Sequence, residues 1–182
     1  QPFAEVGPND PFRVWLTDAD LAPKLEAENP LINATESRSR QGNASGSIID
    51  GDPETYVVTF DNTKRGVDEY KVSLAKPILV DRITFVHGKT FHDGGWFDLS
   101  KGPVEYRFVL ADGKVLRGEV NYPATTSTDA KGLKGGEKFT VALVQPCAVA
   151  SITFTGHPAS GDNPAQSFSS CAEILVRVVK KR

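Results

Sequence analysis

Hydrophobic and polar residues alternate with a period of two along much of this chain. In residues 104–110, Val, Tyr, Phe and Leu occupy every second position with Glu, Arg and Val between them, and Ile152 and Phe154 alternate with polar neighbours in the same way. Successive side chains of a β-strand point to opposite faces, so this pattern is typical of strands with one face in a core and the other in water.

Runs of this kind recur, and Gly, Pro, Asn or Asp bound each of them. We expect strands at residues 56–60, 70–74, 78–87, 104–110, 115–122, 138–144, 149–155 and 172–179. Ala111-Asp112-Gly113-Lys114 supplies a hairpin turn between two of them. Because no long helical pattern interrupts these eight runs, they predict an all-β domain built as an antiparallel β-sandwich.

Residues 1–32 do not follow this pattern, since loop-forming Pro, Asn and Asp interrupt them. We expect an N-terminal leader or linker that packs on the domain, and we place the sandwich in residues 33–182. The expected anchors of the leader are its larger apolar side chains, Phe12, Val14, Trp15 and Leu16.

Length and charge exclude several classes of function. The chain has 182 residues and a formal net charge of -2. A nucleic-acid-binding surface concentrates Lys and Arg on one face, and the only basic run is Lys180-Lys181-Arg182, so we expect no nucleic-acid partner. No apolar run approaches the roughly 20 residues that a membrane-spanning helix needs, so we expect no transmembrane segment.

The two cysteines, Cys147 and Cys171, lie at the starts of two successive predicted strands. If these strands pair as an antiparallel hairpin, their starts lie at opposite ends of it, beyond the reach of a disulfide. We therefore expect two free thiols, buried as small hydrophobic groups.

Two stretches far apart in the chain carry oxygen donors that suit one calcium ion. Ca²⁺ takes roughly six to eight oxygen ligands, and the glycine between Asp50 and Asp52 allows a tight turn that points oxygens inward. The predicted ligands are Ser47, Asp50, Asp52, Thr55, Ala172 and Glu173. The alternative is an ordinary surface turn with a solvated glutamate. One ion would tie the two ends of the domain together.

Five short motifs, in a fixed order, carry a resemblance to a known family. They are Ala34-Thr35-Glu36-Ser37, residues 48–55, Ile83-Thr84-Phe85, Ser151-Ile152-Thr153-Phe154 and residues 170–174. Over residues 33–179 this order resembles discoidin or coagulation-factor (F5/8) type C domains, and especially the galactose-binding-like carbohydrate-binding modules of family 32.

The resemblance implies an eight-stranded jelly-roll β-sandwich, a structural Ca²⁺ near the Asp-Gly-Asp turn, and sugar binding on loops at one end. It carries over the same six calcium ligands, with Ser47 and Ala172 contributing carbonyl oxygens. Many relatives have Trp after the threonine of the turn, where this chain has Tyr56-Val57. That departure concerns packing and leaves the oxygen ligands in place.

A sugar site combines an aromatic ring, which packs on C–H groups, with polar side chains that bind hydroxyls. Three predicted loops offer both: residues 38–43, 88–98 and 157–168. The predicted ligand-binding residues are Arg38, Asn43, Lys89, His92, Asp93, Trp96, Phe97 and Phe168.

The loop 88–98 is the richest of the three. Gly94-Gly95 would let the backbone turn sharply and bring Trp96 near a ligand, and we expect one of Trp96 and Phe97 to be buried and the other presented. Phe168 falls where the family often places its stacking aromatic. Lys89 replaces an Arg that is frequent in relatives, so the resemblance does not specify galactose.

Two alternatives remain open. His92, Asp93, Asp98 and Tyr106 are residue types that polysaccharide lyases and glycosidases use, although no catalytic motif fixes their geometry. Phe91 and its aromatic neighbours could instead contact a membrane or a protein, as in discoidin-like adhesion domains.

We therefore expect a non-catalytic carbohydrate-binding module that binds glycan through loops at one end of a calcium-stabilised sandwich. It would be ancillary to a covalently attached carbohydrate-active enzyme. We expect a monomer that is secreted, periplasmic or on the cell surface.

Overall fold

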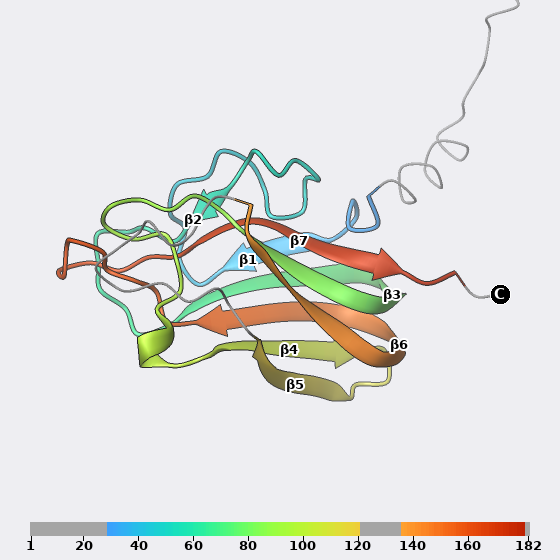
Figure 1. Cartoon of the computed structure of the whole chain (residues 1–182). Helices are drawn as coiled ribbons and strands as arrows, with labels where there is room; N and C mark the ends of the chain where they lie inside the picture. Colours follow the sequence, from blue (N-terminus) through green and yellow to red (C-terminus); the bar gives the residue numbers. More distant parts are fainter. Residues whose placement is uncertain (1–28, 121–135, 181–182) are drawn as a thin grey trace, which may run out of the picture.

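Seven strands and one 3₁₀ turn form the computed structural model, which describes residues 29–120 and 136–180 (Figure 1). They are β1 (Thr35–Arg38), β2 (Val57–Val58), β3 (Asp68–His87), η1 (Leu99–Lys101), β4 (Val104–Leu110), β5 (Val115–Val120), β6 (Lys138–Gly156) and β7 (Ser170–Val178). The strand order is β2-β7-β3-β6-β4-β5, with β1 also on β3, and every pairing is antiparallel. The predicted all-β antiparallel sandwich is confirmed.

The strands β3 and β6 are long and bent, and each combines two of the predicted strands. β3 joins the runs predicted at 70–74 and 78–87, and β6 joins the runs predicted at 138–144 and 149–155. The structure also adds β1, which the strand prediction did not include, and reduces the run predicted at 56–60 to the two residues of β2.

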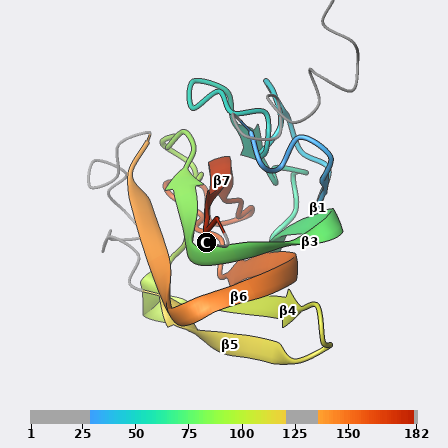
Figure 2. The same cartoon turned by 90° about the vertical axis from the view of Figure 1, so that its right-hand side faces the viewer.

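Together, β3 and β6 form a ribbon that folds over at one end of the molecule. Their register breaks between Ser73 and Ile78 of β3, and residues 143–146 of β6 have no partner in β3. Before its break β3 pairs with β1 and with residues 151–156 of β6. After it, β3 pairs with residues 147–149 and then 138–142 of β6, and with β7. Figure 2 shows the two halves of the ribbon diverging, which produces the two layers of the sandwich.

Aromatic side chains fill the space between the layers. The ring of Phe85 lies against those of Tyr70, Phe97, Phe139 and Phe154, with centroid separations from 5.0 to 5.8 Å. All five residues are buried. The burial of such large rings stabilises the closed sandwich.

The hairpin of β4 and β5 has the predicted orientation. Val104 and Phe108 are fully buried, whereas Glu105 and Arg107 are exposed. Gly113 closes the hairpin with φ +83°, a backbone conformation that favours glycine.

Both cysteines are free, as predicted. Cys147 pairs with Val80 and Cys171 with His87, so the thiols lie near opposite ends of the second half of β3. Cys171 is buried, whereas Cys147 is only half-buried.

The core includes residues on the N-terminal side of the predicted boundary at residue 33. Leu31 is 2% exposed, and Asn29 Nδ2 donates to the carbonyl oxygen of Ile49 at 3.1 Å. The predicted anchors of the leader lie outside the described residues: Phe12, Val14, Trp15 and Leu16. Within the described ranges, no helix is long and apolar enough to cross a membrane.

Candidate functional site

The loop after β3 (88–98) and the loop before β7 (157–169) meet at the end of the sandwich opposite the bends of the ribbon (Figure 1). We call this the apical end. Gly95 N–H donates to the carbonyl oxygen of Phe168 at 2.9 Å, and Phe168 N–H donates to that of Ala159 at 3.0 Å. Backbone hydrogen bonds therefore hold the two loops in a fixed relation.

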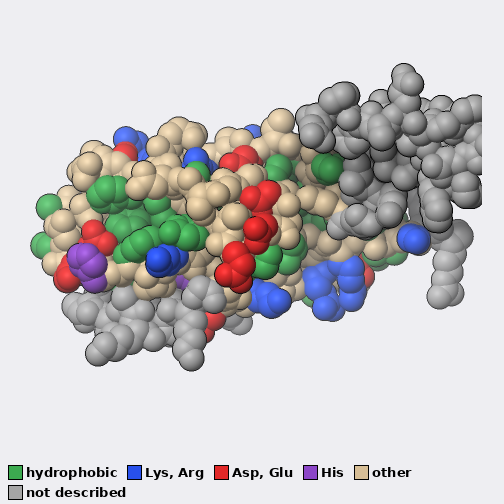
Figure 3. Space-filling model, turned by 90° about the horizontal axis from the view of Figure 1, so that it is seen from above, with side chains coloured by type: hydrophobic (Ala, Val, Ile, Leu, Met, Phe, Trp, Pro, Cys, Tyr) green, Lys and Arg blue, Asp and Glu red, His purple; other side chains and the backbone are tan. Residues whose placement is uncertain are grey.

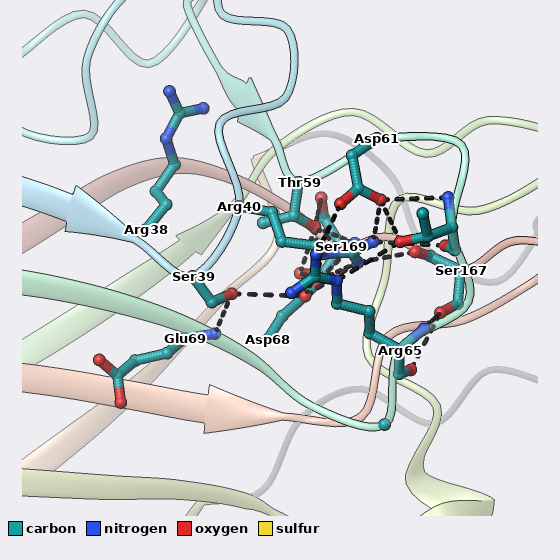
Figure 4. Close-up of polar contacts among 12 residues, drawn as sticks. Arg38, Ser39, Arg40, Thr59, Asp61, Arg65, Asp68, Glu69, Ser167 and Ser169 are labelled. Carbon is teal, nitrogen blue, oxygen red and sulfur yellow. Dashed lines mark hydrogen bonds and ion pairs between the residues drawn. The ribbon is translucent and has the colours of Figure 1, made fainter.

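A buried ion pair between Arg40 and Asp68 connects three segments at the apical end (Figure 4). Arg40 Nε and Nη2 donate to the two carboxylate oxygens of Asp68 at 2.9 and 3.0 Å, and neither residue is more than 3% exposed. Arg40 also donates to the Ser167 carbonyl oxygen at 2.6 Å and to Asp61 at 2.9 Å. Arg40 thus joins the chain after β1 to the loops that precede β3 and β7.

Hydroxyl groups complete the surroundings of Asp68. Its carboxylate accepts hydrogen bonds from the hydroxyls of Thr59 and Ser169, and the Tyr70 hydroxyl lies 3.0 Å from Ser169 Oγ. Burial raises the pKa of Tyr70 well above its usual value, so this hydroxyl stays protonated. This network could not be predicted from the sequence, because Arg40 and Asp68 lie among other polar residues and no local pattern marks them as buried.

Four rings form what we call the apical aromatic cluster: Tyr56, Phe60, Phe91 and Phe168. Phe168 is its buried member at 4% exposed, with ring centroids 5.1 Å from Phe60 and 5.8 Å from Phe91. The Tyr56 and Phe91 centroids are 6.3 Å apart, and Lys89 Nζ lies 5.5 Å from the Phe91 centroid. Because Tyr56, Phe60 and Phe91 are half-buried, the cluster offers apolar surface to a ligand.

Polar pairs on the same two loops add hydrogen-bonding groups. His92 Nδ1 lies 2.8 Å from Asp162 Oδ2, and the Asp93 carboxylate accepts a hydrogen bond from Gln166 Nε2. The His92 side chain is 79% exposed, and its hydrogen bond with Asp162 raises its pKa. Figure 3 shows hydrophobic side chains gathered on one face with Lys or Arg, His and acidic side chains at their margin.

Trp96 and Phe97 are both buried, at 0% and 1% exposed, so the expectation that one of them is presented is wrong. The chain does turn tightly at Gly95, where φ is +106° and a Cβ would lie 2.5 Å from the carbonyl oxygen of Lys89. This turn sends both rings into the interior. The ring that the loop leaves half-exposed is that of Phe91.

The structure does not bring all predicted sugar ligands together. Lys89 lies over the aromatic cluster, whereas Arg38 and Asn43 lie beside β2. Arg38 Nη1 donates to the Val58 carbonyl oxygen at 3.4 Å, and Val58 N–H donates to that of Asn43 at 2.8 Å. Within the described residues, neither side chain hydrogen-bonds to the loop 88–98.

A hollow of about 370 Å³ lies beside the cluster, and its lining includes Tyr56, Lys89, Glu54 and His87. His87 is fully buried, and its Nε2 lies 2.8 Å from Thr90 Oγ1. Burial lowers the pKa of His87 to about 4, so the ring is neutral at neutral pH. The hollow therefore combines an aromatic ring, an amine and a carboxylate.

The two stretches predicted to bind calcium meet in the structure. Gly51 N–H donates to Glu173 Oε1 at 2.8 Å, which brings the Glu173 carboxyl group to the turn that carries Asp50. Burial, together with the Asp50 carboxylate, raises the pKa of Glu173 to about 8. Burial alone would raise the pKa of Asp50, but its hydrogen bonds, including those from Glu173 and Ser47 N–H, lower it overall. Ala172, also buried, precedes Glu173 in β7.

The other predicted calcium ligands of the turn, Ser47, Thr55 and Asp52, hydrogen-bond within the turn. Thr55 Oγ1 donates to Asp50 Oδ2 at 2.9 Å, and Ser47 N–H donates to the same oxygen at 2.9 Å. The Asp52 carboxylate instead accepts from Glu54 N–H at 3.0 Å and so caps its own turn. The Asp50 carboxylate likewise accepts from Asp52 N–H at 2.9 Å, so both aspartates of the turn hydrogen-bond to its backbone.

The donor set fits calcium chemically. All candidate donors are oxygens, and two carboxyl groups in contact form a place where a divalent cation is favourable. Among the residues that the structure describes, no three His, Cys, Asp or Glu side chains could hold a metal by themselves. Backbone carbonyls, such as those predicted for Ser47 and Ala172, would have to complete the shell.

No protein-family model and no curated protein sequence matches the chain. Solved structures do match its fold. The family 32 carbohydrate-binding module of NanJ from Clostridium perfringens, in complex with galactose, has a TM-score of 0.57 and 21% identity, over 81% of this chain and 96% of that one. CpGH89CBM32-5 from Clostridium perfringens, in complex with GalNAc-β-1,3-galactose, has a TM-score of 0.57 and 16% identity, over 81% and 97%.

A fucolectin from striped bass (Morone saxatilis) serum is similar as well, with a TM-score of 0.54 and 14% identity, over 84% of this chain and 49% of that one. The chain therefore has a galactose-binding-like, discoidin-type β-sandwich fold. More narrowly, it shares the fold of family 32 carbohydrate-binding modules, as the sequence resemblance predicted. At these identities the likeness concerns the fold.

Proposed function

We propose that this domain is a non-catalytic carbohydrate-binding module that holds a glycan at the apical aromatic cluster. The observation that carries the proposal is the half-buried ring of Phe91, with Lys89 Nζ 5.5 Å from its centroid and the His92–Asp162 pair on the same loops. The ring supplies a face for the C–H groups of a sugar, and the polar groups bind its hydroxyls.

Two further observations support a glycan over a lipid or protein ligand. Structures with this fold are described in complex with galactose and with GalNAc-β-1,3-galactose. The charged groups at the margin of the hydrophobic face suit a polar ligand better than a membrane (Figure 3). Because few side chains are available as anchors, we expect weak binding.

The residues that a lyase or glycosidase would use lie in separate surroundings. Asp98 is buried, caps η1 and pairs with Lys101 at 3.2 Å, whereas the Tyr106 ring stacks on that of Phe108 at 4.7 Å. A catalytic acid and base must both reach the reacting group. These positions favour binding over catalysis.

Affinity electrophoresis in soluble polysaccharides, with a glycan array, tests the proposal. We expect Phe91→Ala and Lys89→Ala each to weaken retention about tenfold, which corresponds to losing one good contact. Leu175→Ala, which removes an apolar side chain that is 41% exposed outside the cluster, is the matched control and should bind normally. Unchanged retention of Phe91→Ala, or glycan turnover that His92→Ala abolishes, would contradict the proposal.

We also propose that Ca²⁺ binds between Asp50 and Glu173 and stabilises the sandwich. The ion would supply the positive charge that two adjacent carboxylates need, and it would link the turn 50–55 to β7. At about one hundred times the dissociation constant, it should add about 2.7 kcal/mol to the free energy of unfolding.

Thermal unfolding in Ca²⁺ and in EGTA measures this effect. Asp50→Asn should abolish the difference between the two conditions, whereas Asp81→Asn, which breaks a surface ion pair with Arg177, should preserve it. A wild-type melting temperature that is the same in Ca²⁺ and in EGTA would show that no such site operates.

Finally, we propose that the domain acts outside the cytoplasm, secreted, periplasmic or on the cell surface, as an ancillary module of a larger carbohydrate-active enzyme. Weak binding serves such a module well, because it only has to keep the attached enzyme near its polysaccharide. We expect this 19.7 kDa chain to sediment as a monomer, and a stable dimer would contradict that expectation.

A further inference from the structure

The outer face of one layer carries a groove of about 440 Å³ that lies apart from the apical site. Side chains from β3, β4, β5 and β6 line it, and these strands run side by side in Figure 2. The register places four residues opposite one another across the strands, which we call the acidic row: Glu69, Thr155, Glu105 and Glu119. A second row lies two positions further along the strands, and we call it the basic row: Lys71, Thr153, Arg107 and Arg117.

Like charges face each other in both rows. Glu105 is opposite Glu119 and Arg107 is opposite Arg117 in the ladder between β4 and β5. Such pairs are destabilising, and alternating the charges would remove the cost. Within the described part of the chain, none of these four exposed side chains forms an ion pair or a hydrogen bond. The arrangement therefore costs stability and leaves four charged groups available to a ligand.

The dimensions of the rows suit an extended ligand. Crossing from β3 to β5 spans three strand spacings, or about 14 Å, and the two rows lie about 7 Å apart. Thr153 and Thr155 contribute hydroxyls in the middle of the groove, and Thr153 is only 5% exposed. The groove therefore presents three kinds of hydrogen-bonding group. Its carboxylates accept hydrogen bonds, its guanidinium groups donate them, and its hydroxyls do both.

The charge pattern selects the chemical class of this ligand. The acidic row repels a polyanion, the basic row repels a polycation, and an apolar chain would bury charges without partners. A neutral polyhydroxylated chain offers donors and acceptors at every unit and meets none of these penalties.

We propose that this groove is a second binding site, which holds a stretch of neutral glycan chain across β3, β6, β4 and β5. The carboxylates of the acidic row accept hydrogen bonds from sugar hydroxyls, and Arg107 and Arg117 donate to sugar oxygens. The site shares its ligand class with the proposed function but none of the apical residues.

The test uses the full chain and named probes: soluble xylan, galactan and laminarin as neutral chains, polygalacturonate as an anion and chitosan as a cation. We expect Arg107→Thr/Arg117→Thr to weaken retention by a neutral polysaccharide about tenfold. Its melting temperature should stay the same or rise, because the substitution removes a like-charge pair and adds strand-favouring threonines. Arg82→Thr/Lys76→Thr removes the same charge from exposed positions outside the groove and should retain wild-type binding.

Amide NMR separates this site from the apical one. Oligosaccharides of the retained polysaccharide should shift the amide signals of Thr153 and Thr155, and they should still do so in Phe91→Ala. Loss of apical binding alone would therefore leave the groove shifts intact, and failure of the groove would leave the apical shifts intact.

Four results would overturn the inference. They are an absence of shifts at Thr153 and Thr155 with every neutral probe, wild-type retention of the double variant, stronger binding to polygalacturonate or chitosan than to any neutral chain, and a dimer in sedimentation that the double variant dissociates. The last would identify a second copy of this chain as the occupant of the groove.

Discussion

His87 shows how the fold fixes the chemistry of one side chain. It ends β3, it is fully buried, and its ring contacts the Thr90 hydroxyl at 2.8 Å. Burial lowers its pKa to about 4, whereas an exposed histidine titrates near pH 6.5. His92, five residues further along the chain, lies in the solvent instead and pairs with Asp162.

The buried ring makes stability depend on pH. Because the pKa of His87 is lower in the folded state, the unfolded chain binds more protons between about pH 6.5 and 4, and stability falls as pH is lowered through this range. We expect His87 to account for a loss of about 2–3 kcal/mol between about pH 7.5 and 4.5. Urea unfolding at the two values, for the wild type and His87→Gln, measures the difference, and equal losses would contradict the assignment.

The positions of some residues could be predicted from the sequence, and those of others could not. Asp50 and Glu173 could be paired because the motifs around them occur in a fixed order in a known family, and Gly51 N–H does bond to Glu173. The directions of Trp96 and Phe97 could not. A glycine pair permits a sharp turn, but only the packing of the core decides on which side of that turn a ring lies.

At the scale of elements, the strand predictions failed where strands had to be joined. The sequence around Pro77 and Pro146 indicates breaks, because proline has no N–H to donate to a ladder. Both prolines do lie where the ladder between β3 and β6 is interrupted, yet the strands continue on either side. Each proline therefore marks a bend between layers, which a pattern of period two cannot distinguish from the end of a strand.

The Arg40–Asp68 pair links segments that belong to different elements of the fold, so breaking it should lower the stability of the whole domain. Asp68→Asn would leave the buried Arg40 guanidinium with the partly exposed Asp61 as its remaining counter-charge, so we expect a loss of about 3 kcal/mol in the free energy of unfolding. The matched control is Asp81→Asn, whose partner Arg177 is at the surface, and it should cost less than about 1 kcal/mol. Denaturant unfolding measures both.

A loss no larger than that of the control would contradict this role of the Arg40–Asp68 pair. The double variant Arg40→Met/Asp68→Leu sharpens the test, because replacing both charges by apolar groups removes the unpaired ion. We expect it to be more stable than Asp68→Asn alone.

For the whole molecule, alternating strands and one family resemblance were enough to predict the class of fold. Of the predicted sugar ligands, Phe168 belongs to the aromatic cluster and Lys89 lies over its Phe91 ring, whereas Arg38 and Asn43 lie beside β2. Loop residues carry no periodic signal, so their neighbours depend on contacts between distant segments. Phe60 shows this, because only the folded chain places its ring 5.1 Å from that of Phe168.

The core of the domain begins before residue 33, and this can be measured. A chain that starts at Asn29 keeps the buried Leu31 side chain and the hydrogen bond to Ile49, whereas one that starts at Asn33 loses both. We expect the shorter chain to be less stable by about 2–5 kcal/mol, the cost of removing a buried leucine. In the full chain Leu31→Ala should show a similar loss, and Ile32→Ala, 44% exposed, a small one. Equal stabilities of the two truncated chains would contradict this.

The folded ribbon of β3 and β6 has a mechanical consequence. Both strands begin and end at the apical end, and their bends close the other end of the sandwich covalently. The two layers therefore cannot separate at the bends without breaking the ribbon, and any opening motion must pivot there. An opening of this kind would displace the loops that carry Lys89 and Phe91 most, because they lie farthest from the bends, and the Arg40–Asp68 pair at the same end would resist it.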